Sequence, residues 1–194
     1  MKKNEQNIDL NRLEQMAETD PPGFLNIYES LRDQADHIQQ NTLDYYQAIA
    51  LVTMNQLEQA ETLALELLSS ALGTANYLQI ARCNLILSRC YSVGEDRFRE
   101  KAFLDNAYEA ALKSKDDLII VTSLMHLGSY YQRKRDAAKA LETYAKVARH
   151  IDEQDQPLIQ AKLKLAEGTI HYHREEYDKA LPQLLKAQDA DLYT

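Results

Sequence analysis

The residues of this sequence that could support redox or metal chemistry are two cysteines and a pair of histidines. Cys83 and Cys90 are seven residues apart, so a helix would place both thiols on one face, as a redox or metal pair requires. Free cysteine, however, is among the most buried residue types and packs as a small apolar side chain. We therefore interpret the two cysteines as core residues.

His171 and His173 flank a tyrosine and would be the other candidate ligand pair. On a helix, residues two apart point in different directions, and a helical metal pair needs the i, i+4 spacing. The sequence also contains no GxxxxGK[ST], GxGxxG, HExxH or CxxC motif. We expect no catalytic residue, no metal site and no cofactor in this chain, and leave open an enzymatic output domain after Thr194.

The composition of the 194-residue chain favours helices and disfavours nucleic-acid binding. Its 30 acidic and 22 basic residues give a net charge of −8, whereas nucleic-acid phosphates need a basic face. Only 5 glycines and 4 prolines are present, which suits helices joined by short loops. The sequence contains no secretory signal and no apolar run of about 18 residues, so we expect a cytoplasmic protein without a membrane partner.

Small residues recur along the chain with a period of about 40 residues. A larger residue follows each one three positions later, as Tyr91 follows Ser88 and Tyr131 follows Gly128. A second small residue, about 12 positions after the first, would anchor a second helix in each repeat. The predicted repeat-packing residues are Ala48, Ala60, Ser88, Tyr91, Ala102, Gly128, Tyr131, Ala140, Tyr144, Gly168 and Ala180.

Turn and capping residues predict where the helices end. Gly73 and Gly94 suit the left-handed position after a helix, and Asp116 and Asp136 suit N-caps. Pro182 suits a helix interior poorly, so we expect the last helix to begin later than residue 177. The expected helices cover 8–18, 22–39, 42–54, 57–72, 75–93, 97–114, 118–134, 137–151, 157–174 and 177–190.

The stretch LMHLGSYYQRKRDAAKALETYAKV resembles a tetratricopeptide repeat (TPR). Leu127, Gly128, Tyr131, Ala140 and Tyr144 have the family's L-G-x-x-Y…A-x-x-x-Y spacing. The resemblance extends more weakly over residues 41–190. The repeat is longer than the family's usual period of about 34 residues. In this respect the chain resembles the long-helix TPR variety that precedes output domains in bacterial signalling proteins.

The resemblance implies an all-α fold, a right-handed superhelical solenoid of antiparallel helix pairs. We expect a single domain over residues 1–194. Lead-in helices over 1–40 would precede helix-pair repeats over 41–74, 75–116, 117–154 and 155–194.

The resemblance also implies a concave groove, lined by the first helix of each pair, that binds a partner. Arginines in such a groove suit an acidic or carboxylate-bearing peptide or helix. The alternative is an ordinary solvated helix face, which we favour for the run Arg133, Lys134 and Arg135 because cations complement a helix C-terminus. The predicted groove residues are Arg82, Leu85, Arg89, Met125, Ser129, Gln132, Arg133, Lys162, Leu165 and Tyr172.

The expected function is a non-catalytic protein- or peptide-binding module, the regulatory or sensor region of a larger bacterial signal-transduction protein. The alternatives are a stand-alone TPR adaptor or scaffold, and the input domain of a diguanylate cyclase or a helix-turn-helix regulator. No polar capping helix follows the last repeat, and solenoid ends normally need one. The uncapped C-terminal end therefore indicates one of two arrangements: the protein continues after Thr194, or a second copy covers this end in a homodimer.

Overall fold

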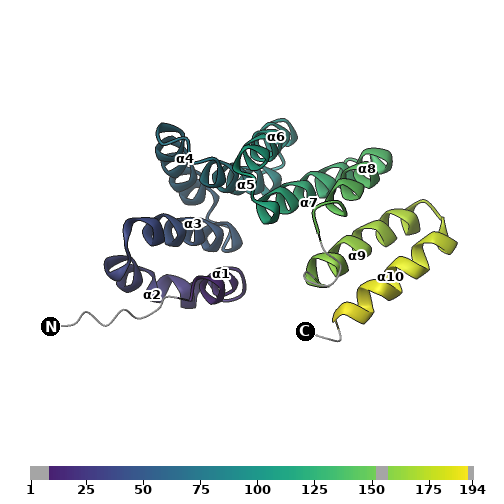
Figure 1. Cartoon of the computed structure of the whole chain (residues 1–194), viewed down its shortest axis with the longest axis horizontal. Helices are drawn as coiled ribbons and strands as arrows, with labels where there is room; N and C mark the ends of the chain where they lie inside the picture. Colours follow the sequence, from purple (N-terminus) through teal and green to yellow (C-terminus); the bar gives the residue numbers. More distant parts are fainter. Residues whose placement is uncertain (1–8, 152–156, 192–194) are drawn as a thin grey trace. The chain divides into compact units, whose positions relative to one another are not determined.

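The computed structural model describes residues 9–151 and 157–191, and every regular element in these ranges is an α-helix (Figure 1). The all-α prediction is confirmed. No helix of the described ranges is long and apolar enough to cross a membrane. The helices are α1 (Leu10–Thr19), α2 (Pro21–Gln34), α3 (His37–Thr53), α4 (Leu57–Gly73), α5 (Tyr77–Val93), α6 (Arg97–Ser114), α7 (Asp117–Arg133), α8 (Ala137–Val147), α9 (Pro157–His173) and α10 (Tyr177–Asp191).

The chain divides into two compact units, Met1–Glu100 and Lys101–Thr194, and the division falls within α6. In the first unit α3 packs against α1, α2, α4 and α5. In the second unit α7 packs against α8, and α9 packs against α10 and also contacts α7 and α8 (Figure 1). Each unit therefore builds its core by packing helix on helix.

From α3 onward the first residues of successive helices are evenly spaced along the chain. A residue with positive φ lies two positions before the start of α4, α5, α6, α7, α8 and α10, and none of these residues is a glycine. Helix pairs therefore repeat with the period that the small residues predicted. The left-handed residues are Asn55, Ala75, Glu95, Lys115, Arg135 and Glu175.

One turn geometry joins successive helices. At the α7–α8 turn the Arg135 N–H donates to the Gln132 carbonyl at 2.9 Å, and the Asp136 N–H donates to the Tyr131 carbonyl at 3.0 Å. The Asp136 carboxylate accepts the Lys139 N–H at 3.1 Å and so caps α8. The turns after α3, α4, α5 and α9 close with the same pair of backbone bonds.

The prediction of left-handed glycines at Gly73 and Gly94 is wrong. Gly73 is the last residue of α4, Gly94 has a φ of −73°, and neither has a positive φ. The turn places the left-handed conformation directly before the N-cap of the next helix, at Ala75 and Glu95. A left-handed L-residue costs roughly 1–2 kcal/mol. The two hydrogen bonds that close the turn, rather than the residue type, therefore set the helix ends.

The glycine inside α7 marks a close approach to α8. A Cβ added at Gly128 would lie 2.6 Å from Cζ of Tyr144, whose side chain is almost fully buried. Gly168 has the matching place in the next pair, where a Cβ would lie 2.8 Å from Cγ of Leu184. The earlier residues of this series, Ala48 and Ser88, are also buried. Small side chains at this position let the two helices of a pair approach closely.

The second series of anchors contains one wrong residue. Ala60, Ala140 and Ala180 are buried, and each is the fourth residue of its helix. Ala102 is exposed, and the fourth residue of α6 is Glu100, which is 2% exposed. Its carboxylate accepts a hydrogen bond from Nη1 of Arg97 at 3.1 Å, which stabilises a charge in a buried position. The spacing from one helix start to the next is therefore constant, and Glu100 rather than Ala102 holds the anchor position of α6.

Two of the predicted packing residues, Tyr91 and Tyr131, are half-buried rather than core. Each ring lies beside a cation of the following helix. The Arg99 guanidinium is 5.2 Å from the centroid of Tyr91, and Nζ of Lys139 is 5.7 Å from that of Tyr131. These cation–π contacts fasten the end of one helix to the first turn of the next.

Three predicted helix boundaries are also wrong: the end of 22–39, the start of 42–54 and the end of 137–151. The helix expected over 22–39 ends at Gln34, because Asp36 and Gln39 form a capping box that starts α3. The Asp36 carboxylate accepts the Gln39 N–H at 2.8 Å, and the Gln39 side chain accepts the Asp36 N–H at 3.1 Å. Helix α8 ends at Val147 rather than at 151. Helix α10 begins at Tyr177, as the expected range 177–190 has it. The expectation of a later start is wrong, because α10 keeps Pro182 in its interior, where a proline removes one backbone donor.

Replacing Gly128 by alanine should destabilise the protein, because the new methyl group would displace the buried Tyr144 ring. Overpacking of this kind costs about 1–3 kcal/mol. Gly73→Ala is the matched control, since Gly73 is also helical but a Cβ there meets nothing within 4 Å. The control should be neutral or stabilising by up to about 1 kcal/mol. Urea unfolding of both variants measures the difference, and equal effects would contradict the close approach.

Replacing Ala75 by glycine should stabilise the protein, because Ala75 has a φ of 52°. Relief of the left-handed strain exceeds the added chain entropy by about 0.5–1 kcal/mol. Thr74→Gly is the control, since Thr74 lies in the same turn with a φ of −104° and should lose stability. Thermal unfolding of the two variants should shift the midpoint in opposite directions.

Candidate functional site

The predicted groove residues of the first unit lie on a face that the protein itself already covers. Leu85 is 2% exposed, so its assignment to an open groove is wrong and it belongs to the core. Arg82 and Arg89 are half-buried. The Arg82 guanidinium lies 5.3 Å from the ring centroid of Tyr45, a contact between α5 and α3. This face is therefore an internal helix–helix contact.

Helix α1 supplies a carboxylate to the same face. Glu14 hydrogen-bonds to Tyr46 and lies beside Arg82. Burial raises the pKa of Glu14, and the Arg82 cation partly offsets that rise. Arg82 therefore already faces an acidic residue of its own chain. In the first unit the N-terminal helix lies where we expected an acidic partner.

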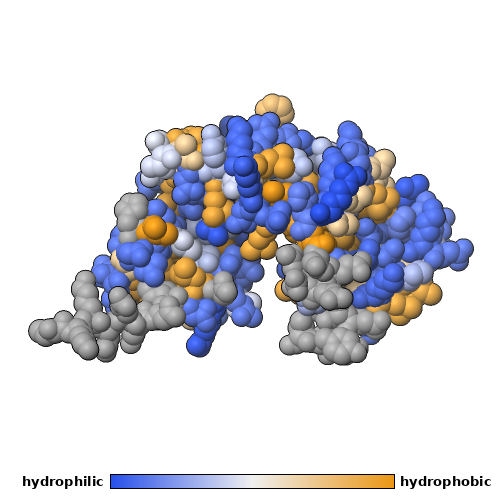
Figure 2. Space-filling model, viewed as in Figure 1, coloured by the Kyte–Doolittle hydropathy of each residue, from blue (hydrophilic) through white to orange (hydrophobic). Residues whose placement is uncertain are grey.

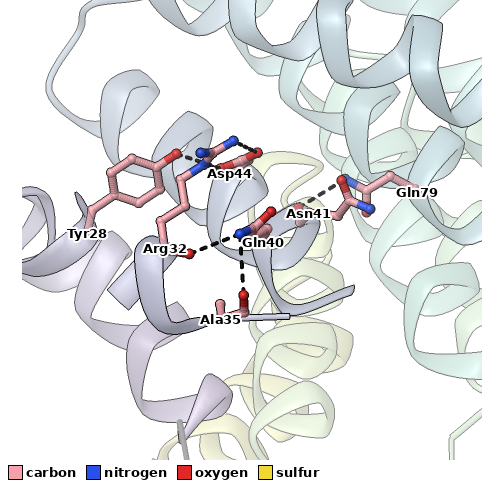
Figure 3. Close-up of polar contacts among 7 residues, drawn as sticks. All are labelled: Tyr28, Arg32, Ala35, Gln40, Asn41, Asp44 and Gln79. Carbon is pink, nitrogen blue, oxygen red and sulfur yellow. Dashed lines mark hydrogen bonds and ion pairs between the residues drawn. The ribbon is translucent and has the colours of Figure 1, made fainter. Parts of the chain in front are cut away.

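A polar network centred on the buried Asp44 joins α2 and α3, and a separate hydrogen bond joins α3 and α5 (Figure 3). Asp44 accepts hydrogen bonds from Oη of Tyr28 at 2.5 Å and from Nε of Arg32 at 2.8 Å. Nε2 of Gln40 donates to the Arg32 carbonyl at 3.1 Å, and Nε2 of Gln79 donates to the Asn41 carbonyl at 3.4 Å. Burial and the adjacent Asp44 carboxylate raise the pKa of Tyr28.

The polar groups of this network bond to one another, which makes it a structural link rather than a ligand site. Asp44 is 8% exposed and has two donors on α2. A buried carboxylate is stable when it is paired and hydrogen-bonded in this way. The network therefore holds α2 against α3.

The two cysteines are free and buried on α5. Burial raises the pKa of the Cys83 thiol to about 12 and that of the Cys90 thiol to about 11. A thiol needs its thiolate form to attack or to bind a metal. Neutral, buried thiols of this kind pack as core residues.

The side chains of the two histidines lie in different surroundings. Nδ1 of His171 lies 2.7 Å from the Glu176 carboxylate at the α9–α10 turn, whereas His173 borders a pocket. The pKa of Glu176 is lowered by this hydrogen bond, by Lys179 and by Arg174. Within residues 9–151 and 157–191, no group of three or more His, Cys, Asp or Glu side chains could hold a metal ion.

The pocket beside His173 is the candidate functional site. It lies in the second unit, between the end of α7, the start of α8 and the end of α9, and it has a volume of about 690 Å³. Three of its residues are members of the predicted groove. Its lining consists of Ser129, Gln132, Arg133, Arg135, Ala137, Ile170, His173 and Arg174.

The lining is basic and, among the residues described, includes no aspartate or glutamate. Nη1 of Arg133 donates to Oγ of Ser129 at 2.9 Å. The Arg174 guanidinium pairs with Glu176 at 2.9 Å. The Arg135 side chain makes no hydrogen bond or ion pair within the described part of the chain. Three guanidinium groups around one hollow can bind carboxylate or phosphate oxygens through paired hydrogen bonds.

The sequence missed two of these arginines. Arg135 and Arg174 follow helices α7 and α9 and belong to the turns that join each pair. The sequence predicts a solvated helix end for the run Arg133–Arg135. Arg133 is also one of the predicted groove residues. A search for groove residues on helices alone cannot find side chains on turns. The constant position of the turn within each repeat is the signal that could have found them.

The remaining predicted groove residues of the second unit lie outside the pocket lining. Met125 is half-buried, and Lys162 is exposed. Leu165 and Tyr172 are exposed on α9. The Tyr172 ring contacts the His173 ring with 5.8 Å between centroids, so Tyr172 adjoins the pocket without lining it.

Removing the carboxylate of Asp44 should destabilise the first unit more than removing the Tyr28 hydroxyl. Asp44→Ala leaves a buried hydroxyl without its acceptor and should cost about 3 kcal/mol, whereas Tyr28→Phe leaves Arg32 in place and should cost about 1 kcal/mol. Tyr108→Phe is the control, because the Tyr108 hydroxyl makes no hydrogen bond within the described ranges. Urea unfolding gives the three values, and an Asp44→Ala effect no larger than the control would contradict a structural network.

Comparisons with protein families, with curated proteins and with solved structures found no match to this chain. The TPR resemblance therefore stays a prediction from the residues of the sequence.

Proposed function

We propose that this chain is a TPR-like protein-binding module whose second unit binds an acidic segment of a partner protein. The observation that carries the proposal is the pocket of about 690 Å³ lined by Arg133, Arg135, Arg174 and His173. The chain as a whole has a net charge of −8. A basic pocket in an acidic protein attracts anionic groups and repels cationic ones.

The size and the chemistry of the pocket agree with a peptide side chain or a carboxyl terminus. Ligand pockets commonly measure about 300–1,000 Å³. Arginine offers a planar fork of donors that matches a carboxylate. Ile170 and Ala137 add apolar surface at the same pocket, which suits the carbon stem of a glutamate or an adjoining apolar residue.

The proposed module is a right-handed superhelical array of helix pairs in which these pairs are the repeats. The even spacing of the helix starts and the small residues at Gly128 and Gly168 support this arrangement. By its resemblance to the long-helix TPR variety, the module would serve as the regulatory or sensor region of a larger bacterial signalling protein. Its role there would be recognition of a protein segment.

The proposal is tested by selecting binders from a displayed library of random peptides and reading their sequences. We expect the selected peptides to be enriched in aspartate and glutamate. A labelled selected peptide should bind Arg135→Glu at least about tenfold more weakly than the parent, a loss of about 1.4 kcal/mol. Fluorescence anisotropy measures the affinities.

Lys115→Glu is the matched control for this experiment. Lys115 is also an exposed turn residue with a positive φ, and its substitution changes the net charge by the same amount. It does not line the pocket. Selection of peptides without acidic residues, or equal weakening by both variants, would remove the pocket as the binding site.

A further inference from the structure

The last helix pair carries an exposed apolar face. On α9, Leu165 and Tyr172 are 54% and 55% exposed and lie seven residues apart. On α10, Tyr177, Leu181 and Leu185 are also exposed and lie four residues apart. These spacings place each set on one side of its helix. Hydrophobic residues are visible over α10 at the lower right of Figure 2.

The two stripes form one surface. The rings of Tyr172 and Tyr177 meet at the turn with 5.8 Å between their centroids. Helices α9 and α10 run antiparallel from this turn (Figure 1), so Leu165 and Leu185 lie at similar distances along the two helices. We name these residues the α9–α10 face: Leu165, Tyr172, Tyr177, Leu181 and Leu185.

In the first unit, the helix that follows a helix pair packs over the equivalent face of that pair. Helices α3 and α4 form the pair that corresponds to α9 and α10 in the repeat, and α5 packs against both of them. Arg82 of α5 lies over the ring of Tyr45 on α3, and Tyr91 of α5 hydrogen-bonds to Glu61 on α4. Tyr45 and Val52 are buried. One helix of 17 residues thus covers the α3 part of the face, whereas Leu65 on α4, which corresponds to Leu185, stays 45% exposed.

The corresponding positions on the last pair are exposed, and two of them carry leucine where the first unit has a tyrosine and a glutamate. Leu165 corresponds to Tyr45, Tyr172 to Val52, and Leu181 to Glu61. In the part of the chain that the structure describes, no helix lies on them as α5 lies on α3 and α4. The α9–α10 face therefore has the form of a site for one more helix.

Charge identifies the kind of helix that fits. Tyr172 of the α9–α10 face contacts the ring of His173, and His173 lines the basic pocket. The apolar face and the pocket are therefore adjacent. A helix seated on the face would bring one of its ends to Arg135 and Arg174, where acidic side chains are favoured. A second copy of this acidic chain is less suited to the place, since its own pocket is equally basic.

We infer that the α9–α10 face binds an amphipathic α-helix of a partner protein, with an apolar stripe along the helix and acidic residues at the end that reaches the basic pocket. The inference rests on the proposed function, because it takes the pocket as the site of the acidic residues. It adds that the partner segment is helical and that most of its apolar contacts lie on α9 and α10. Apolar anchors on one side of the partner helix are expected at i, i+3 or i+4, and i+7.

The test uses a displayed library of helix-favouring peptides of 17 residues, the length of α5, with randomised surface positions. Selected peptides should carry an apolar stripe with acidic residues at one end, and far-ultraviolet circular dichroism should show their helicity rising on binding. Leu181→Asp should weaken binding at least tenfold. Leu118→Asp is the control, because Leu118 and Leu181 are both 59% exposed and Leu118 belongs to α7.

Combining these variants with Arg135→Glu separates the two proposals. Binding weakened by Arg135→Glu but not by Leu181→Asp overturns the helix site and leaves the acidic pocket in place. Binding weakened by Leu181→Asp but not by Arg135→Glu overturns the proposed pocket, and the inference with it. A chain that sediments as a dimer and becomes monomeric in Leu181→Asp would assign the face to a second copy and overturn the inference. Weakening by both variants, with Leu118→Asp unchanged, is the expected result.

Discussion

The structure depends on a turn in which one residue between two helices adopts the left-handed conformation. The turn closes with two backbone hydrogen bonds after α3, α4, α5, α7 and α9, and the helices from α3 onward begin at even spacing along the chain. Because this spacing is constant, a given position on one helix of a pair always meets the same position on the other. Gly128 meets Tyr144, and in the next pair Gly168 meets Leu184. Turn length thus determines which side chains pack together.

The number of helices, their approximate bounds and the small residues of the first series could be predicted from residue types alone. Glycines and alanines at regular spacing are visible in a sequence, because close helix packing restricts side-chain volume. The second series could not be completed in the same way. A buried glutamate, Glu100, holds the position where the pattern predicts a small residue, and the predicted residue, Ala102, is exposed. Its ion pair with Arg97 has the local i, i+3 spacing that a sequence can show, but the burial of Glu100 depends on the packing of the other helices.

The candidate site could be predicted only in part, for a related reason. Ser129, Gln132 and Arg133 lie on a helix and follow the repeat, so the resemblance selects them. Arg135 and Arg174 lie on turns, and only the geometry of the turns brings them to the same pocket. In the first unit the same reasoning failed because Leu85 is buried and Arg82 already faces a residue of α1. The covering of a helix face by another helix is a tertiary fact that spacing does not reveal.

One of the residues with positive φ, Arg135, belongs both to a turn and to the lining of the basic pocket. Glycine would relieve the backbone strain at each turn, yet no glycine of the described chain has a positive φ. At Ala75 the side chain offers no polar group in return for this strain. At Arg135 the same conformation directs a guanidinium to the basic pocket, which glycine could not supply.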